Sequence, residues 1–490
     1  MHYRAVRFGV ILLFFINLFA GFIFINEGLF HYDAVCLARA VEDTLRTGHL
    51  QPAARGRYGS VFINTFIALP FFLMGQDADL ATRLSSVLFH ASSIAMLFLL
   101  VYELFGDFLP ALFSGLLFSF VPFYFSPNTY GKEHGMSIFF VLLSFYLLRR
   151  GQRRNSYLLM GLSSFFLGFS VSVKESVVMA SPLYFLLYFS PQINLRPFGI
   201  SVPKDKFRWK SLVAVGTPFL IIFAILYSAY LKDEFFRELF IRDLSCAEFL
   251  GPCSFMLKQA FKDLGKSIPP VLFLFSGLGA VRLVRKNELF LALFLCLWFT
   301  LIFFFGNLAT YGARYLDIVV IPALLLAAYS LSALFAKDKL MSLAILIYFV
   351  MSMFLFLYPT VSFRHRYNGE KQFAELVRQI TPKNALIITM DDAVFIEYYG
   401  ERKTLTHPVD DRLKIMDFVR TVAVHLVNKT PVYVTESSFS YDHKGLFWEA
   451  MMKSFKFTHI GSRFCEDYHR PELDPVQYQA DLFKLDFLKP

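Results

Sequence analysis

The stretch LFLALFLCLWFTLIFFF, residues 289–305, carries no charge and is apolar almost throughout. An α-helix needs about 20 mostly apolar residues to cross a bilayer, so this stretch predicts a membrane-spanning helix. The pattern recurs along the first 360 residues. The further predicted spans are residues 8–26, 84–102, 110–125, 136–149, 157–173, 176–190, 211–230, 268–281, 315–333 and 339–358.

The composition of the whole chain agrees with a membrane protein. Of its 490 residues, 56% are hydrophobic and 18% are charged, whereas a typical soluble domain has about 25% charged residues. A soluble protein of this composition would expose more apolar surface than water tolerates. A cytosolic enzyme, a secreted module and a disordered chain are therefore excluded. The predicted fold class is a polytopic α-helical membrane protein with about eleven transmembrane helices.

The net charge of +10 lies entirely in the first 360 residues, because residues 361–490 hold 18 basic and 18 acidic residues. A basic chain can bind nucleic acid, but no basic cluster here is interleaved with aromatic residues. We therefore expect no nucleic-acid partner. The excess of positive charge is better explained by basic loop residues, which orient helices in a membrane.

One apolar stretch, residues 60–75, is either a twelfth span or a helix lying at the membrane interface. Basic residues concentrate in cytoplasmic loops, and this rule separates the two cases. If 60–75 does not cross and the N-terminus is cytoplasmic, the cytoplasmic segments hold 16 basic and 5 acidic residues. If it crosses, the arginine-rich run 149–154 lies outside. We therefore predict eleven spans and an interfacial helix at 60–75.

That topology places two large segments outside the cytoplasm, the loop 27–83 and the tail 361–490. The tail is long enough to form its own core and is predicted to be an α/β domain. Its predicted elements are helices at 370–380 and 410–427 and strands at 385–389, 432–434 and 455–460. The expected localisation is the plasma (inner) membrane, multi-pass, with the C-terminal domain extracytoplasmic.

Two of the five cysteines, Cys246 and Cys253, lie six residues apart before the span at 268–281, in a segment predicted to be external. They could form a disulfide in an oxidising compartment. The alternative is two free thiols. The chain contains no CxxC pair, so a disulfide framework is not predicted.

The first candidate for chemistry is Asp33, in the sequence His31-Tyr32-Asp33 shortly after the first span. A carboxylate at the membrane boundary can activate a hydroxyl or an amine, or hold a metal. The alternative is structural, because aspartate also caps helices well and could begin a helix at 34–47.

A second cluster, residues 129–134, ends in Glu133-His134 at the outer end of the fourth span. The acid, the base Lys132 and the imidazole together could position an acceptor or bind a metal, although a polar turn that begins a helix would look the same. His31 and His134 make a divalent metal possible, but no ligand spacing is diagnostic of one.

Three cations are predicted at the same membrane level: Arg83, Lys174 and Arg314. Arginine binds phosphate through a planar fork of donors, and lysine acts as a point charge. Each residue alone could merely anchor the protein at the lipid headgroups, and Lys174 could instead form a local ion pair with Glu175. Together they indicate a site for an anionic lipid headgroup.

The order of these features resembles the GT-C superfamily of integral-membrane glycosyltransferases, over roughly residues 8–335. It runs from a short N-terminal span through an external aspartate, a Gly48-His-Leu…Pro52 stretch and an apolar interfacial helix. Next come an Arg before the second span and an acidic turn before the fourth span. The order ends with a Lys after the fifth span and a late Arg-Tyr. Within that superfamily the sequence resembles the protein O-mannosyltransferases and the bacterial enzymes that add aminoarabinose to lipid A.

The resemblance implies site residues and a reaction. Asp33 matches the presumed catalytic aspartate, although many relatives have Asp-Glu where this chain has Asp33-Ala34. The acidic residue of the second motif falls at Glu133 or at His134. Lys174 and Arg314 match positions expected near the donor phosphate. Residues 1–360 would form a GT-C-like catalytic domain with a polyprenyl- or dolichyl-phosphate sugar donor.

The chemistry predicted from this resemblance is an inverting sugar transfer outside the cytoplasm, with Asp33 as the base. The cations would stabilise the phosphate leaving group, and the acceptor is a lipid, a glycan or a protein. The chain contains neither GxxxxGK[ST] nor GxGxxG opening a helix, as expected without a nucleotide-sugar site. The alternatives are a transporter or flippase for lipid-linked sugars and an O-antigen polymerase or ligase. Transporters often show paired, interrupted helices, a pattern that this sequence lacks.

Overall fold

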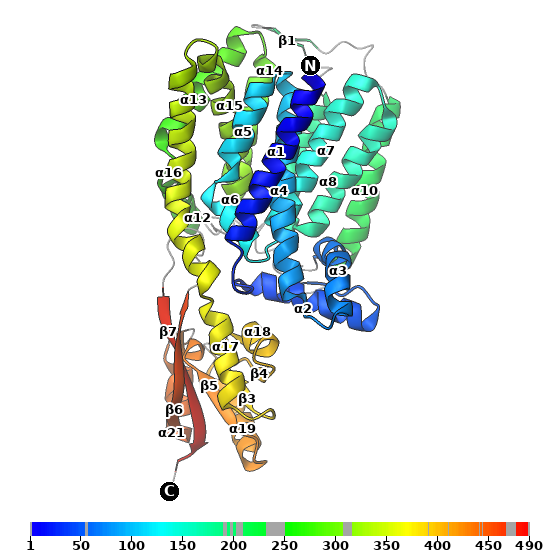
Figure 1. Ribbon diagram of the computed structural model, residues 1–490. Coiled ribbons are helices and arrows are strands. Elements are labelled where there is room, and N and C mark those ends of the chain that lie inside the picture. Colours follow the sequence, from blue (N-terminus) through cyan, green and yellow to red (C-terminus); the bar gives the residue numbers. More distant parts are fainter. Residues whose placement is uncertain are drawn as a thin grey trace.

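The computed structural model shows a bundle of long helices with a smaller mixed domain attached at one end (Figure 1). It describes residues 2–53, 57–189, 194–196, 199–201, 209–231, 250–306, 316–390, 392–409, 411–440, 442, 444–466 and 477–488.

The bundle has its core around two helices, α4 (Ala78–Phe105) and α15 (Asp317–Phe335). Helix α4 packs against α1, α5 and α7, and α15 packs against α5, α13, α14 and α16. The other bundle helices are α1 (His2–Ile23), α5 (Phe108–Ser119), α7 (His134–Arg154), α8 (Tyr157–Val173), α9 (Ser181–Phe189), α10 (Trp209–Leu231), α12 (Leu250–Ser267), α13 (Pro270–Arg285), α14 (Leu289–Gly306) and α16 (Lys339–Arg366). A two-stranded hairpin, β1 (Asn194–Arg196) with β2 (Gly199–Ser201), precedes α10.

The lengths of these helices are those of a membrane protein. Among the described residues, four helices are long and apolar enough to cross a bilayer, and six if each of two bent helix pairs counts as one span. Shorter apolar helices, including α8 and α14, accompany them. The prediction of a helical, polytopic membrane protein is confirmed.

Two of the predicted spans are interrupted in the structure, and a third begins at a sharp bend. The span at 110–125 is α5 followed by α6 (Pro122–Phe125) and the 3₁₀ turn η2 (Ser126–Thr129), with a bend of 71°. Proline lacks an N–H and clashes with the preceding turn, so a helix commonly breaks there. The segments α12 and α13 meet at 96° before Pro270. The span at 176–190 begins as the 3₁₀ helix η3 (Glu175–Ala180) before α9.

Two helices at the end of the bundle nearest the tail do not follow the bundle axis. Helix α2 (Tyr32–Thr47) runs across this end, and α3 (Tyr58–Leu73) lies beside it (Figure 1). Helix α3 corresponds to the helix predicted at 60–75. It packs against α2, α4 and α8.

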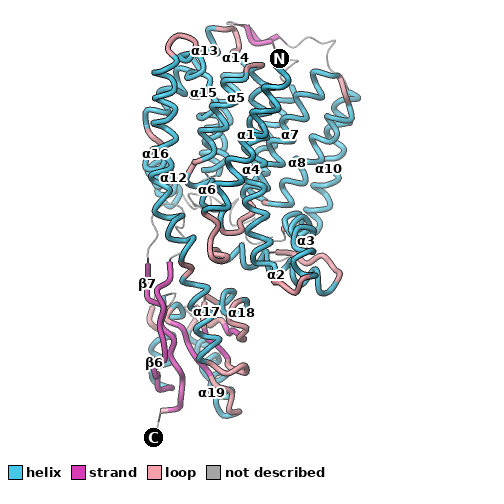
Figure 2. The backbone as a smooth tube through the Cα atoms, viewed as in Figure 1, coloured by secondary structure: helices cyan, strands magenta, loops and turns pink. Residues whose placement is uncertain are grey.

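The tail is a five-stranded mixed sheet with helices, and Figure 2 shows the strands gathered there. Its strand order is β4-β3-β5-β7-β6, with the first three strands parallel and the last two antiparallel. The elements are α17 (Gly369–Ile380), β3 (Leu386–Ile388), α18 (Ala393–Tyr398), β4 (Lys403–Leu405), α19 (Arg412–Val427), β5 (Val432–Thr435), α20 (Ser437–Ser440), α21 (Leu446–Ser454), β6 (Phe455–Glu466) and β7 (Gln477–Phe487). Both predicted helices and all three predicted strands are confirmed. Strands β4 and β7 were not predicted.

The tail packs on α2 through a shared hydrophobic core. Phe30 and Val35, at the start of α2, belong to the same buried cluster as Phe373 of α17 and Phe395 of α18. The hydroxyl of Tyr399 accepts from the Leu29 backbone N–H at 2.9 Å. The tail therefore holds in place the segment that carries Asp33.

Candidate active site

Helix α2 begins two residues earlier than the capping alternative requires. Its N-cap is His31, whose Nδ1 accepts from the Asp33 backbone N–H at 3.1 Å. Asp33 itself lies in the first helical turn. The reading of Asp33 as the cap of a helix at 34–47 is therefore wrong, and its carboxylate is directed to other partners.

The Asp33 carboxylate contacts two cations from other parts of the chain. Its Oδ2 lies 2.5 Å from Lys132 Nζ and 3.2 Å from Arg57 Nη1. The side chain of Lys132 is 1% exposed and that of Arg57 is 4% exposed, whereas that of Asp33 is 15% exposed. The cations thus lie beneath the carboxylate, which keeps a face open to the surface.

Arg57, the residue before α3, is the centre of the cluster. Its Nη1 donates to Glu133 Oε1 at 2.7 Å as well as to Asp33. Its Nε and Nη2 donate to the two oxygens of Glu175 at 2.9 and 3.0 Å. This second contact is the bidentate pairing that the planar guanidinium favours.

Electrostatics explains why so many buried charges are tolerated here. Burial alone would lower the pKa of Arg57, but Glu133, Glu175 and Asp33 hold that pKa well above its ordinary value. Burial alone would raise the pKa of Glu133, yet Arg57, Lys132 and Lys174 lower it below its ordinary value. Arg57 and Glu133 are therefore both charged at neutral pH, and they compensate each other as a buried ion pair.

A second group of buried polar side chains joins this cluster. His134, the first residue of α7, has its Nδ1 2.6 Å from Asp317 Oδ2. Lys174 Nζ lies 2.5 Å from His134 Nε2. An ionised carboxylate can only accept, so Nδ1–H donates to Asp317 and Nε2 accepts from Lys174, whose Nζ also lies 3.0 Å from Nδ1.

The break between α8 and η3 explains how two adjacent residues, Lys174 and Glu175, contact different groups of side chains. Lys174 has an extended backbone, with φ −153° and ψ 117°. In an extended chain, successive side chains point to opposite sides. Lys174 therefore reaches His134 while Glu175 reaches Arg57. A β-carbon at Gly59 would lie 2.1 Å from the Ser172 Oγ, so only glycine lets α3 approach α8 this closely. That approach delivers Arg57 to Glu175.

The structure places the remaining predicted site residues elsewhere or leaves them undescribed. Arg83 contacts Asp79 at 2.5 Å and also donates to the Asn26 carbonyl, so it ties the loop after α1 to α4. Arg314 and Cys246 lie outside the described residues, and so does the side chain of Cys253. Within the described parts of the chain, no three His, Cys, Asp or Glu side chains are grouped so that they could hold a metal ion.

Two members of the cluster were not proposed from the sequence: Arg57 and Asp317. An ionisable residue inside or beside an apolar stretch is a functional candidate by default. Asp317 lies within the predicted span at 315–333, and Arg57 lies just before the apolar helix at 60–75. That signal could have found both. Lys132 was expected in the cluster at 129–134, but nothing local indicated its contact with Asp33.

Residues 60–198, which include Lys132, Glu133, His134, Lys174 and Glu175, match a family model. Its description is dolichyl-phosphate-mannose-protein mannosyltransferase. The predicted glycosyltransferase class is confirmed. The resemblance to GT-C enzymes thus extends beyond the order of features, although Asp33 and Arg57 lie before the matched region.

Solved structures of other membrane glycosyltransferases share the fold of this glycosyltransferase. ArnT from Cupriavidus metallidurans bound to undecaprenyl phosphate matches with a TM-score of 0.61 and 13% identity over 97% of each chain. The oligosaccharyltransferase AglB from Archaeoglobus fulgidus, in complex with an inhibitory peptide and a dolichol-phosphate, matches with a TM-score of 0.58 and 12% identity. That match covers 92% of this chain and 73% of AglB.

A mycobacterial arabinofuranosyltransferase, AftD, matches with a TM-score of 0.51 and 10% identity over 97% of this chain and 40% of its own. At these identities the structures show a common fold. No curated protein sequence matches this chain significantly.

Proposed function

We propose that this glycosyltransferase moves a sugar from a polyprenyl- or dolichyl-phosphate donor to an acceptor on the extracytoplasmic side of the membrane. The observation that carries the proposal is a partly exposed carboxylate, Asp33, set against the buried cations Lys132 and Arg57. The matched family and the lipid phosphates bound to ArnT and AglB support a donor of this class.

In this mechanism Asp33 is the base. The acceptor oxygen attacks the anomeric carbon and gives its proton to the Asp33 carboxylate, while the bond from that carbon to the phosphate oxygen breaks. The phosphate leaves with the electron pair, and a single displacement inverts the anomeric centre. Glu175 is also partly exposed, but both its oxygens are held by Arg57. Asp33 is therefore the better base.

Cations stabilise the departing phosphate in this proposal. We assign this role to Lys174, together with Arg314 of the segment before α15. Developing negative charge is stabilised most strongly by groups already oriented in a site that excludes water. Lys174 is buried and held by His134, so it meets this condition. Arg83 is already paired with Asp79, and we assign it to positioning the loop after α1.

The class of activity can be tested by reconstituting the protein in liposomes with a panel of polyprenyl-phosphate sugars. We expect one donor to lose its sugar and the free polyprenyl phosphate to accumulate. Complete absence of both transfer and hydrolysis with every donor would contradict the proposal and favour a transporter. A preference for a pyrophosphate-linked oligosaccharide would instead indicate a polymerase or ligase.

Replacing Lys174 with Ala should lower kcat/KM for the lipid-phosphate donor by about 10- to 100-fold, because a hydrogen bond to a charged group contributes about 1.5–3 kcal/mol. The Arg314→Ala variant should behave in the same way. The measurement is steady-state kinetics with the donor varied, alongside a thermal unfolding curve for each variant. The exposed Lys339→Ala serves as the control. An unchanged kcat/KM for the donor in both variants would place the phosphate elsewhere.

The proposed orientation is a cytoplasmic N-terminus, eleven membrane crossings and an extracytoplasmic tail. One end of the bundle carries the N-terminus, and α2, α3 and the tail lie at the other (Figure 1). Arg7 of α1, Glu103 of α4 and Arg150 of α7 line one cavity at the N-terminal end. Basic residues concentrate at that end, which is the arrangement of a cytoplasmic face.

Cysteine labelling of the full-length protein tests this orientation. A membrane-impermeant maleimide applied to intact cells should label Arg420→Cys, on the exposed surface of α19, and should label Arg154→Cys only after permeabilisation. The parent protein reports the background from the native cysteines. Labelling of both positions in intact cells would refute the eleven-span topology.

A further inference from the structure

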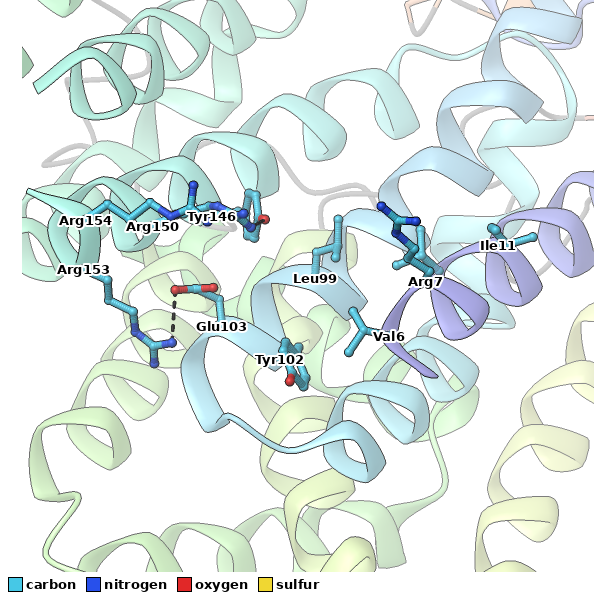
Figure 3. A pocket seen from close by; sticks show the side chains of 11 residues that line it. Val6, Arg7, Ile11, Leu99, Tyr102, Glu103, Tyr146, Arg150, Arg153 and Arg154 are labelled. Atoms are coloured by element: carbon cyan, nitrogen blue, oxygen red, sulfur yellow. Dashed lines mark hydrogen bonds and ion pairs between the residues drawn. The ribbon is translucent and has the colours of Figure 1, made fainter. Parts of the chain in front are cut away.

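A cavity of about 720 Å³ opens at the end of the bundle away from Asp33. Figure 3 shows side chains of α1 on one side of it and side chains of α7 on the other, with the end of α4 between them. Helix α1 contributes Arg7, and the last two turns of α7 contribute Arg150, Arg153 and Arg154. Glu103 of α4 is the one acidic lining residue.

The charges of the lining do not cancel. Glu103 is neutralised by Arg153, whose Nη1 lies 3.1 Å from Glu103 Oε1. Arg150 donates to the hydroxyl of Tyr146, a neutral acceptor, and its guanidinium lies 5.5 Å from the centre of that ring. The lining as a whole therefore keeps an excess of three positive charges. A cavity with this excess favours an anion, and guanidinium groups favour phosphate in particular.

The rest of the lining is apolar and continues into a surface that faces lipid. Val6, Val10 and Leu99 form part of the wall. Ile11 also lines the cavity, and with Phe15 and Phe19 it forms an exposed row along α1, each residue one helical turn from the next. This row of side chains starts at the basic cavity and continues along the lipid-facing side of α1. This combination fits an amphiphile, with an anionic head above the arginines and an acyl chain along α1.

We propose that this cavity binds the phosphate headgroup of an anionic phospholipid. Basic pockets between membrane helices on the cytoplasmic side are suited to such headgroups. The bound lipid would join α1 and α7, whose arginines at this end repel one another when the cavity lacks an anion. The proposal is independent of the transfer reaction, because the cavity lies at the opposite end of the bundle from Asp33.

The test uses the full-length protein in phosphatidylcholine nanodiscs with and without dioleoylphosphatidylglycerol. We expect the anionic lipid to raise the thermal unfolding midpoint and native mass spectrometry to detect bound lipid. The Arg7→Gln/Arg150→Gln double variant should lose at least about ten-fold in apparent affinity for that lipid. The matched control is Lys337→Gln/Lys339→Gln, which removes two exposed charges from the turn after α15. It should retain the affinity of the parent protein.

Several outcomes would overturn the proposal. One is equal affinity for the anionic lipid in the Arg7/Arg150 variant and the parent protein. Another is an equal loss of affinity in the Lys337/Lys339 control, which would indicate attraction to the whole face rather than to the cavity. Displacement of the lipid by inorganic phosphate alone would identify a free anion as the ligand. Preference for undecaprenyl phosphate over phosphatidylglycerol would identify the donor lipid instead. If the double variant does not fold, Arg154→Gln and Glu103→Gln, which remove and add net positive charge, should lower and raise the affinity respectively.

Discussion

Replacing Asp33 with Asn should lower turnover by at least about 100-fold while leaving the protein folded. General-base assistance contributes about 10²–10⁴-fold to a rate, and an amide cannot accept the proton of the acceptor. The helix cap should survive, because His31 supplies it through its own side chain. The KM for the donor should remain within a few-fold of the parent value, since Lys174 is unchanged. Turnover with a saturating donor and the thermal unfolding midpoint are the measurements.

Two comparisons make the Asp33 result specific. Asp43→Asn changes the same residue type on the same helix, away from the cluster, and should leave turnover near the parent value. Glu175→Gln tests the rival base, and its effect should be smaller than that of Asp33→Asn. Near-normal turnover in the Asp33→Asn protein, or a larger loss in Glu175→Gln, would remove Asp33 from the role of base.

Replacing Arg57 with Gln should destabilise the protein by about 3–5 kcal/mol and abolish turnover, because the buried Glu133 and the partly exposed Asp33 and Glu175 lose their shared counter-ion. Glu133 and Glu175 both depend on Arg57 in the structure. Arg57→Lys keeps the charge but not the planar fork, so the bidentate contact with Glu175 is lost. We expect the lysine variant to recover much of the stability and little of the turnover. Thermal unfolding and steady-state kinetics separate the two effects.

The matched control for Arg57 is Arg46→Gln. Arg46 also pairs with a glutamate, Glu42, but its side chain is 64% exposed. Exposed ion pairs contribute about 0–1 kcal/mol, so this variant should resemble the parent protein in stability and turnover. If Arg57→Gln has an equally small effect, the cluster is not held together by the Arg57 guanidinium. If Arg57→Lys restores full turnover, the fork geometry is not needed.

The predicted elements of the tail show which features can be derived locally. Its helix α19 and its strands β3 and β5 follow from short periodic or continuous apolar runs, which the structure buries in one core. Strand β7 was missed although it is eleven residues long. It lies between β6 and β5 in the sheet, and its pairing with β5 joins Leu485 to Val432, 53 positions earlier in the chain (485 − 432). A strand whose stability comes from a distant partner leaves a weak local signal.

The candidate site also has one part that the sequence predicts and another part that only the tertiary structure defines. The sequence by itself determined the membrane class, the helices and the identity of Asp33, Glu133, His134 and Lys174 as candidates, because apolar runs and isolated polar residues within them are local features. Only the tertiary structure decided that Arg57 contacts Asp33, Glu133 and Glu175 together, since these partners lie 24, 76 and 118 residues away. The structure also shows that His31, and not Asp33, caps α2, and that Arg83 pairs with Asp79. Buried charges choose partners by proximity after the helices have packed, and no spacing along the chain records that proximity.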